Sequence, residues 1–323
     1  MTPRSQKILG AATIGAALLG GGALALRTPD RPVAELRAKY LGPTSRFLKL
    51  PSGAEVHYRD EGLPGGRPVL LVHGSNASLH TWEPWVALLR DRYRLVSVDL
   101  PGHGLTGPVP SEDYSREGMA RFVGELLDAL GLPKVTYVGN SMGGRVGITF
   151  ALAHPERVDR LVLLDPGGAG DLLPEAERPP AALGFRLAKI PVLSRLSEWG
   201  VPRSIVEKTL RASFADQSKV GEDMVERYVA LLHHPGSRRA TRLRFAEPDP
   251  NGHLRRLGEV RVPTLVLAGT EDRLVPIAGL RLLAAAIPGA ELVEYPGVGH
   301  IPMEEIPERS AADLVRFAPP LPP

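Results

Sequence analysis

Short apolar runs rich in β-branched residues alternate with helical patterns along most of the chain. Buried strands are predicted at Pro68–Val72, Tyr93–Asp99, Lys134–Gly139, Val158–Leu164, Thr264–Ala268 and Glu291–Tyr295, after two shorter strands at Arg46–Leu50 and Glu55–Tyr58. Helices are predicted at Trp82–Arg90, Ser115–Leu130, Gly143–Ala153, Ile277–Ala286 and Pro307–Phe317. Strands and helices alternate at a spacing that predicts an α/β fold with a doubly wound, mostly parallel sheet.

This alternation is interrupted between residues 167 and about 257. The stretch contains helical patterns broken by prolines, at Ala181–Lys189, Arg203–Phe214 and Gly221–Leu232, and no clear strand. An excursion of that length between two sheet strands is typical of a lid over a binding site. We therefore expect one α/β domain over residues 46–318 with a helical lid at about 167–257, followed by a Pro-rich tail at 319–323.

The N-terminal sequence predicts a membrane-associated segment. An uncharged run of 19 residues, Ile8–Leu26, follows Arg4 and Lys7, and as a helix it would span about 28 Å, close to the thickness of membrane hydrocarbon. We expect residues 1–45 to form a retained anchor and a juxtamembrane arm, with the catalytic domain outside the cytoplasm because the positive flank stays inside. The alternatives are a cleaved signal peptide that releases a secreted protein, since Ala23-Leu24-Ala25 matches the cleavage pattern, and a helix buried in the fold.

Composition and charge narrow the functional classes. The chain carries a net charge of +3, but residues 1–45 alone hold six basic and two acidic side chains, so the rest is close to neutral. Bulk charge therefore gives no reason to expect a nucleic-acid partner. The absence of Cys excludes disulfides, thiolate metal sites, iron–sulfur clusters and a cysteine nucleophile.

The strongest chemical signal is the G-x-S-x-G sequence of Gly139–Gly143, which lies between a predicted strand and a predicted helix. In that context the serine occupies a strained turn, tolerated because the two glycines let neighbouring backbone come close. Backbone N–H groups at the start of the helix favour negative charge developing there. The motif predicts Ser141 as a nucleophile.

A serine nucleophile needs a base, and the base needs an acid that orients it. His300 lies on a glycine-containing loop after the last predicted strand, and Asp272 follows the strand before it. Both positions fall at the carboxyl edge of the predicted sheet, and the chain order is Ser141, Asp272, His300. Asp165, at the end of an earlier strand, is the alternative acid.

An oxyanion hole requires two N–H donors aimed at the developing alkoxide. One is expected from Met142, which follows the nucleophile. The other is expected from Ser75, in the loop His73-Gly74-Ser75 after a predicted strand. His73 and His103 are expected to be structural.

Taken together, these residues resemble the α/β-hydrolase superfamily over residues 46–318. The resemblance rests on His73-Gly74, Asp99–Gly104, Gly139–Gly143, Asp272 and Gly299-His300. It implies an α/β-hydrolase fold and a serine hydrolase in which Ser141 attacks, His300 transfers the proton and Asp272 orients it. It implies no metal or organic cofactor.

The stretch Gly139–Gly168 is similar both to meta-cleavage-product C–C bond hydrolases and to general carboxylesterases. Two features depart from the C–C enzymes: HGSNAS at residues 73–78 replaces their HGxGPG, and Ile301 follows His300 where they commonly place Trp. We therefore predict a carboxylic ester hydrolase acting on a small-molecule ester through an acyl-enzyme, with poor turnover of a 2-hydroxy-6-oxo-dienoate. A C–C bond hydrolase and a non-catalytic binding protein of the same fold are the alternatives. Lid arginines such as Arg186 and Arg211 are candidates for binding a substrate carboxylate.

Overall fold

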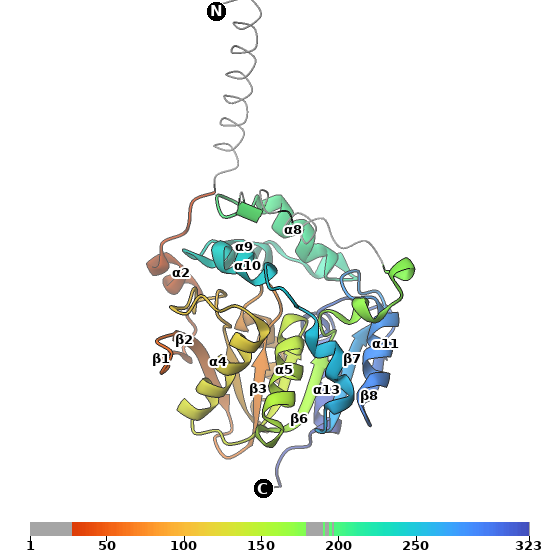
Figure 1. Ribbon diagram of the computed structural model, residues 1–323. Coiled ribbons are helices and arrows are strands. Elements are labelled where there is room, and N and C mark those ends of the chain that lie inside the picture. Colours follow the sequence, from red (N-terminus) through yellow and green to blue (C-terminus); the bar gives the residue numbers. More distant parts are fainter. Residues whose placement is uncertain (1–27, 179–189, 191–193, 196, 323) are drawn as a thin grey trace, which may run out of the picture.

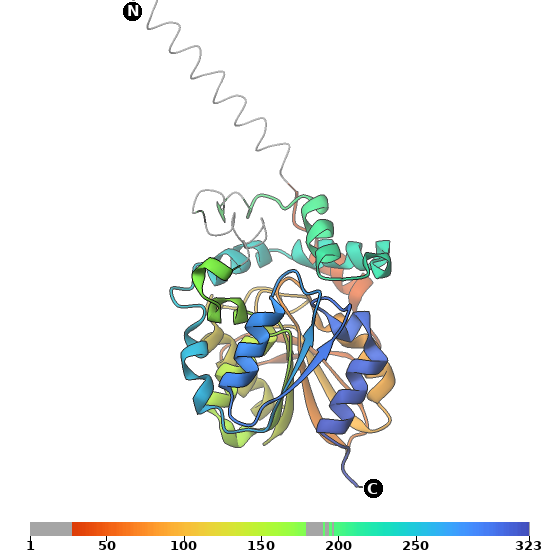
Figure 2. The same cartoon turned by 90° about the vertical axis from the view of Figure 1, so that its right-hand side faces the viewer.

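Eight strands form a single sheet through the middle of the fold, with helices on both faces (Figures 1 and 2). The computed structural model describes residues 28–178, 190, 194–195 and 197–322. The strands are β1 (Ser45–Lys49), β2 (Glu55–Gly62), β3 (Arg67–Val72), β4 (Tyr93–Val98), β5 (Val135–Asn140), β6 (Val158–Leu164), β7 (Thr264–Gly269) and β8 (Glu291–Tyr295). Their spatial order is β1-β2-β4-β3-β5-β6-β7-β8.

The sheet is parallel from β4 to β8, and only β1 with β2 and β2 with β4 pair antiparallel. Parallel neighbours require a crossover, and the chain supplies helices for it, so the predicted doubly wound, mostly parallel sheet is confirmed. Because all these crossovers return the chain in one direction, the loops that follow the parallel strands gather at one edge of the sheet.

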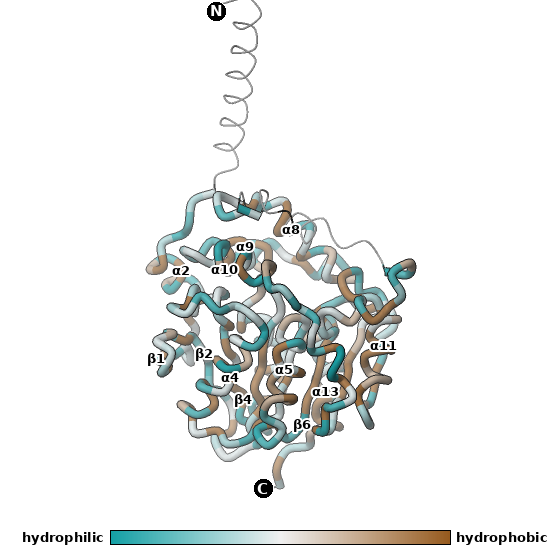
Figure 3. Tube along the Cα trace, viewed as in Figure 1, coloured by the Kyte–Doolittle hydropathy of each residue, from teal (hydrophilic) through white to brown (hydrophobic). Residues whose placement is uncertain are grey.

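Two hydrophobic layers sandwich the sheet. One face is covered by α4 (Arg116–Ala129), α5 (Met142–Ala153) and α11 (Ile277–Ala286), and the other by α3 (Glu83–Leu89) and α13 (Pro307–Phe317). Alternate residues of β3 enter the two layers, Leu70 and Val72 on one side and Val69 and Leu71 on the other. Burial on both faces explains why the strands read as continuous apolar runs, and Figure 3 shows hydrophobic positions gathered on the central strands.

The chain between β6 and β7 contributes α8 (Arg203–Ala212), α9 (Glu222–Leu232) and α10 (Ser237–Phe245), and no strand among its described residues. The helices predicted at 203–214 and 221–232 are present, α10 was not predicted, and the helix predicted at 181–189 lies outside the described residues. These helices lie over the carboxyl edge of the sheet (Figure 1). A hydrogen bond links the two regions: the backbone N–H of His300, after β8, donates to the carbonyl oxygen of Ser213, after α8, at 2.7 Å.

The segment expected to anchor the chain in a membrane, Ile8–Leu26, lies outside the described residues. In the part of the chain that is described, no helix has the length and apolar character needed to cross a bilayer. The segment predicted as a juxtamembrane arm instead packs on the body. Its helix α2 (Val33–Tyr40) buries Leu36 and Tyr40 in a cluster with Leu105.

Ion pairs hold this arm to the helices above the sheet. Arg31 lies 2.9 Å from Glu226, and Arg238 lies 2.7 Å from Asp30. The arm therefore belongs to the folded body and is no argument for an adjacent anchor. The run itself is weakly hydrophobic, since eleven of its 19 residues are Gly or Ala. We correct the prediction accordingly: the membrane anchor, the membrane as a partner, the location outside the cytoplasm and the secreted alternative are all withdrawn.

The two-layer core makes a prediction about stability. Leu71 is fully buried in β3, whereas Leu88 on α3 is 44% exposed. Leu71→Ala should lower the free energy of unfolding by about 2–5 kcal/mol, because it removes packed methyl groups and leaves a cavity. The matched change Leu88→Ala should cost about 0.5 kcal/mol or less. Urea unfolding followed by circular dichroism measures both, and equal costs would contradict the packing described here.

Candidate active site

Ser141 occupies a sharp turn between β5 and α5. Its backbone has φ 50° and ψ −111°, a conformation that is strained for a residue with a side chain. The flanking glycines are sterically required: a Cβ at Gly139 would lie 2.4 Å from the carbonyl oxygen of Gly143, and a Cβ at Gly143 would lie 2.3 Å from that of Val72. The G-x-S-x-G sequence thus forms the expected elbow, with Ser141 at the N-terminus of α5.

His300 and Asp272 meet at the carboxyl edge of the sheet. The Nδ1 atom of His300 lies 2.6 Å from Oδ2 of Asp272, and both side chains are buried. The other carboxylate oxygen, Oδ1, accepts the backbone N–H groups of Leu274 at 2.7 Å and Val275 at 3.0 Å. These bonds fix the carboxylate so that it accepts the Nδ1 proton of His300 and leaves Nε2 free to act as a base.

Asn140 connects the elbow to the histidine loop. Its Nδ2 donates to the carbonyl oxygen of His300 at 3.0 Å and to that of Leu164 at 3.1 Å. Because Asn140 immediately precedes Ser141, the loop that carries His300 is tied directly to the turn that carries the serine. Sequence analysis gave Asn140 no role, since nothing in its surroundings along the chain pointed to His300.

Asp165 lies beside this pair but is held differently. It is fully buried with φ 44°, and its Oδ1 accepts the N–H of Gly269 at 2.9 Å. Its Oδ2 has no hydrogen-bond partner among the described residues. Burial and the charge of Asp272 raise the pKa of Asp165 well above its usual range. A carboxyl group that keeps its proton is poorly suited to orient the imidazole, which favours Asp272 as the acid.

The same three side chains are the one group in the described part of the chain that could approach a metal ion. One ligand atom from each of Asp165, Asp272 and His300 lies within 4.8 Å of the others. However, Nδ1 of His300 and Oδ2 of Asp272 already engage each other at 2.6 Å. The arrangement is therefore better suited to proton transfer than to metal binding.

The expected oxyanion donors lie on two segments that touch. Met142 is the first residue of α5, and Ser75 follows Gly74 in the loop after β3. A Cβ at Gly74 would lie 2.8 Å from Oδ1 of Asn140 and 3.1 Å from Cβ of Ser141, so this loop packs closely against the elbow. Within the described residues neither the Ser75 nor the Met142 N–H has a hydrogen-bond acceptor. Both groups are free to serve as donors.

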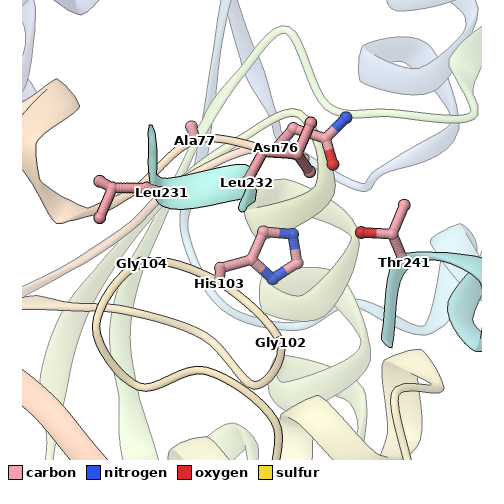
Figure 4. Close-up of a pocket in the computed structure, with 8 residues that line it drawn as sticks. All are labelled: Asn76, Ala77, Gly102, His103, Gly104, Leu231, Leu232 and Thr241. Carbon is pink, nitrogen blue, oxygen red and sulfur yellow. The ribbon is translucent and has the colours of Figure 1, made fainter. Parts of the chain in front are cut away.

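A small cavity adjoins this loop (Figure 4). It is lined by Asn76, Ala77, Gly102, His103, Gly104, Leu231, Leu232 and Thr241. Three buried polar atoms around it have no partner among the described residues: Oδ1 of Asn76, Nε2 of His103 and Oγ1 of Thr241. Nδ1 of His103 lies 2.9 Å from the carbonyl oxygen of Pro101 and donates to it. Burial and the neighbouring His73 lower the pKa of His103 well below its usual range, so its ring is neutral and Nε2 is an acceptor.

A second Ser–His–Asp arrangement lies at the antiparallel edge of the sheet. Oγ of Ser45 lies 2.9 Å from Nε2 of His57, whose Nδ1 lies 2.7 Å from Oδ2 of Asp99. This serine, however, accepts the N–H of Gly42 at 3.1 Å and the Nε–H of Arg59 at 3.3 Å, and it sits within a strand. Ser45 lies neither at an elbow nor at a helix N-terminus. We therefore assign this Ser–His–Asp set a structural role, in which it joins β1, β2 and the loop after β4.

Comparison with known proteins agrees with this geometry. The model of the "alpha/beta hydrolase fold" family matches residues 67–307. A 2-hydroxy-6-oxononadienedioate/2-hydroxy-6-oxononatrienedioate hydrolase from Dechloromonas aromatica is 34% identical over 278 residues, 80% of this chain and 89% of that protein.

Two solved structures bear on the reaction. The meta-cleavage product hydrolase CumD from Pseudomonas fluorescens gives a TM-score of 0.70 at 25% identity, covering 84% of this chain and 96% of that chain. A thermophilic esterase from Thermogutta terrifontis gives 0.69 at 26% identity, covering 84% and 97%.

The relatives match the C–C bond hydrolase alternative better than the ester hydrolase that the sequence led us to favour. The comparisons therefore establish the family of the chain but not an ester substrate. The family model spans most of the described chain, and the chain belongs to the α/β-hydrolase fold family and is a hydrolase of that family.

Proposed function

We propose that this protein hydrolyses a C–C bond in a 2-hydroxy-6-oxo-dienoate, a meta-cleavage product. The observation that carries the proposal is the 34% identity to a hydrolase of such a compound over 80% of the chain. The esterase among the structural neighbours supports carboxylic ester hydrolysis as the second candidate. Both reactions use the same serine nucleophile and pass through an acyl-enzyme, and they differ in the leaving group.

In this proposal His300 removes the hydroxyl proton of Ser141, whose oxygen attacks the ketone carbon. Asp272 accepts a hydrogen bond from the Nδ1–H group of His300 and stabilises the imidazolium. The amides of Ser75 and Met142 stabilise the oxyanion. The C–C bond then breaks, and the electron pair moves into the conjugated system to give a dienolate, which takes the proton held by the imidazolium of His300. The neutral His300 then activates a water that hydrolyses the acyl-enzyme.

The leaving group of a C–C cleavage is a carbanion, so the dienol must first ketonise to provide a place for its electrons. That step removes the proton of the 2-hydroxyl and adds a proton to C5, so it needs a hydrogen-bond acceptor near the hydroxyl. We place this hydroxyl in the cavity of Figure 4, where the neutral Nε2 of His103 accepts its proton in a hydrogen bond. Oγ1 of Thr241 and Oδ1 of Asn76 are the other unpartnered atoms there. A simple ester has no hydroxyl for these groups to bind.

The helices above the sheet complete the proposed site. We propose that α8, α9 and α10 act as a lid on a single hydrolase domain of residues 46–318. The support is their position over the carboxyl edge of the strands (Figure 1) and the part that α9 and α10 take in lining the cavity, through Leu231, Leu232 and Thr241. A lid excludes water, which strengthens the electrostatic stabilisation of the oxyanion.

The roles of Ser141 and of the second Ser–His–Asp set can be separated. Ser141→Ala should lower kcat by about 10⁴–10⁶-fold, because it removes the nucleophile of a unit that acts together. Ser45→Ala, in the set built on His57 and Asp99, should leave kcat within about twofold because that set only joins strands. Steady-state kinetics with circular dichroism as a check of folding measures both, and a large loss of kcat in folded Ser45→Ala would assign catalysis to the wrong set.

The two buried acids can be separated in the same way. Asp272→Asn should lower kcat by up to about 10⁴-fold, because the amide holds the wrong tautomer of His300. Asp165→Asn should lower kcat by about fivefold or less, because a protonated carboxyl and an amide are similar in shape and charge. The comparison uses kcat on one substrate at one pH. A greater loss in Asp165→Asn would make Asp165 the orienting acid.

The substrate class is tested by direct competition between the two reactions. We expect kcat/KM for 2-hydroxy-6-oxononadienedioate to exceed that for p-nitrophenyl butyrate by about tenfold or more, equivalent to about 1.4 kcal/mol in the transition state. Loss of dienol absorbance and release of p-nitrophenol follow the two reactions, with Ser141→Ala as the blank for both. A tenfold preference for the butyrate would replace the proposal with ester hydrolysis.

A further inference from the structure

A second small cavity is bounded by α4, α5 and α10. It is lined by Tyr114, Arg116, Met119, Met142, Arg145, Val146, Arg244 and Glu247. Helix α10 contributes to both cavities, through Thr241 to the first and Arg244 to the second, and these residues are three positions apart and therefore on one face of the helix. The first cavity is neutral, whereas the second is rich in positive charge.

The arginines of this cavity are incompletely paired. Arg116 lies 2.5 Å from Glu117, and Glu247 lies 3.7 Å from Arg116 and 3.8 Å from Arg145. Arg244 has no carboxylate within 4 Å among the described residues, although it is only 7% exposed. Three guanidinium groups therefore share two carboxylates.

The Arg244 guanidinium lies over the ring of Phe245, 4.2 Å from its centroid, but it also carries unused hydrogen-bond donors. In the described part of the chain Nε and Nη2 of Arg244 and Nε of Arg145 are buried without a partner. Burial, followed by the charge of Arg145, lowers the pKa of Arg244 to about 9. Both observations describe a cation that a bound anion would stabilise, because a buried guanidinium without an acceptor is costly.

This cavity is next to the reacting centre. Met142, the proposed oxyanion donor, lines it directly, and the N–H of Arg145 donates to the carbonyl oxygen of Ser141 at 3.2 Å. A Cβ at Gly167 would lie 3.1 Å from Cδ of Arg145 and 3.4 Å from the carbonyl carbon of Ser141, so the Arg145 side chain passes close to the elbow backbone. These contacts connect the lining of the cavity to the backbone of the elbow.

We propose that Arg244 and Arg145 form a carboxylate-binding subsite for the acyl half of the substrate, the half that is transferred to Ser141. The proposal rests on the function proposed above and specifies its substrate class, a dicarboxylic compound whose acyl fragment ends in a carboxylate. Cleavage beside the 6-oxo carbon of a nine-carbon dienedioate leaves such a fragment, a succinyl group, with its carboxylate three C–C bonds from the attacked carbon. The planar guanidinium donors match the two carboxylate oxygens.

The subsite is tested with two p-nitrophenyl esters that differ at the end of the acyl chain. Wild-type protein should hydrolyse p-nitrophenyl hemisuccinate with a kcat/KM at least tenfold above that for p-nitrophenyl butyrate, after the uncatalysed rate is subtracted. Arg244→Gln should lower that ratio by about 10–100-fold, the range expected for losing a charge-assisted contact. The matched control is Arg239→Gln on the same helix, whose side chain is 49% exposed and paired with Glu112, and it should keep the wild-type ratio.

A binding readout that needs no turnover accompanies the kinetics. Succinate should raise the Tm of wild-type protein more than butyrate does at equal concentration, and Arg244→Gln should remove the difference. If Arg244→Gln fails to fold, the wild-type preference and the wild-type Tm difference still decide the question, with Arg145→Gln as the second variant.

The outcomes distinguish the two proposals. A wild-type ratio near one together with equal Tm shifts would overturn the subsite, as would a ratio that folded Arg244→Gln and Arg145→Gln leave unchanged. If 2-hydroxy-6-oxononadienedioate is not cleaved but the preference for the hemisuccinate persists and depends on Arg244, the subsite stands and the C–C reaction is rejected.

Discussion

The close approach of three backbone segments at the end of β5 determines where every other part of the site can lie. The first turn of α5 touches the end of β3 so closely that a Cβ at Gly143 would lie 2.3 Å from the carbonyl oxygen of Val72. The same packing holds Ser141 at φ 50°. Strain of this kind persists only where surrounding structure over-determines it, and here the two hydrophobic layers on the sheet provide that support.

The electrostatics of the buried acids follow from the same geometry. Two carboxyl groups and an imidazole lie within reach of one another at the carboxyl edge, where few groups contact water. Among the described residues, Asp272 accepts hydrogen bonds from two backbone N–H groups and from His300, whereas the carboxylate of Asp165 accepts one from the backbone N–H of Gly269. Burial and the nearby Asp272 therefore raise the pKa of Asp165 and favour its protonated form. Because folding raises the pKa of Asp165, this group favours the folded state at low pH and favours it less as the pH rises through that pKa.

The sheet could be predicted from the sequence because it depends on local patterns, and the proposed triad was inferred from patterns of the same local kind. Apolar runs at regular spacing fix the parallel strands, and in such a sheet the residues that follow β5, β7 and β8 must meet at one edge. The membrane anchor was predicted wrongly from a local pattern too. The hydropathy of the N-terminal run does not show that the next helix, α2, packs on the body through Leu36. The sequence already favoured Asp272 over Asp165, and the distances and backbone donors of the folded chain supply the physical support for that choice.

The arginine cluster shows why substrate preference is harder to predict than the reaction machinery. Its members come from α4, α5 and the end of α10, and no motif in the sequence unites them. The lid arginine considered from the sequence, Arg211, is instead paired with Glu207 at 2.9 Å, and Arg186 lies outside the described residues. The HGSNAS loop and Ile301 led us to favour esters because we compared them with a single sequence pattern of the C–C hydrolases.

The two cavities along α10 suggest a role in substrate binding for the HGSNAS loop. Asn76 of the HGSNAS sequence faces the neutral cavity with His103, on the side proposed for the dienol, and Arg244 faces the cationic cavity on the side proposed for the acyl group. In this proposal, the 2-hydroxyl contacts the neutral cavity and the carboxylate of the acyl half contacts the cationic cavity, so the two cavities together favour one orientation of the substrate. Under the proposal, polar contacts on both sides of the carbonyl thus fix the bond presented to Ser141.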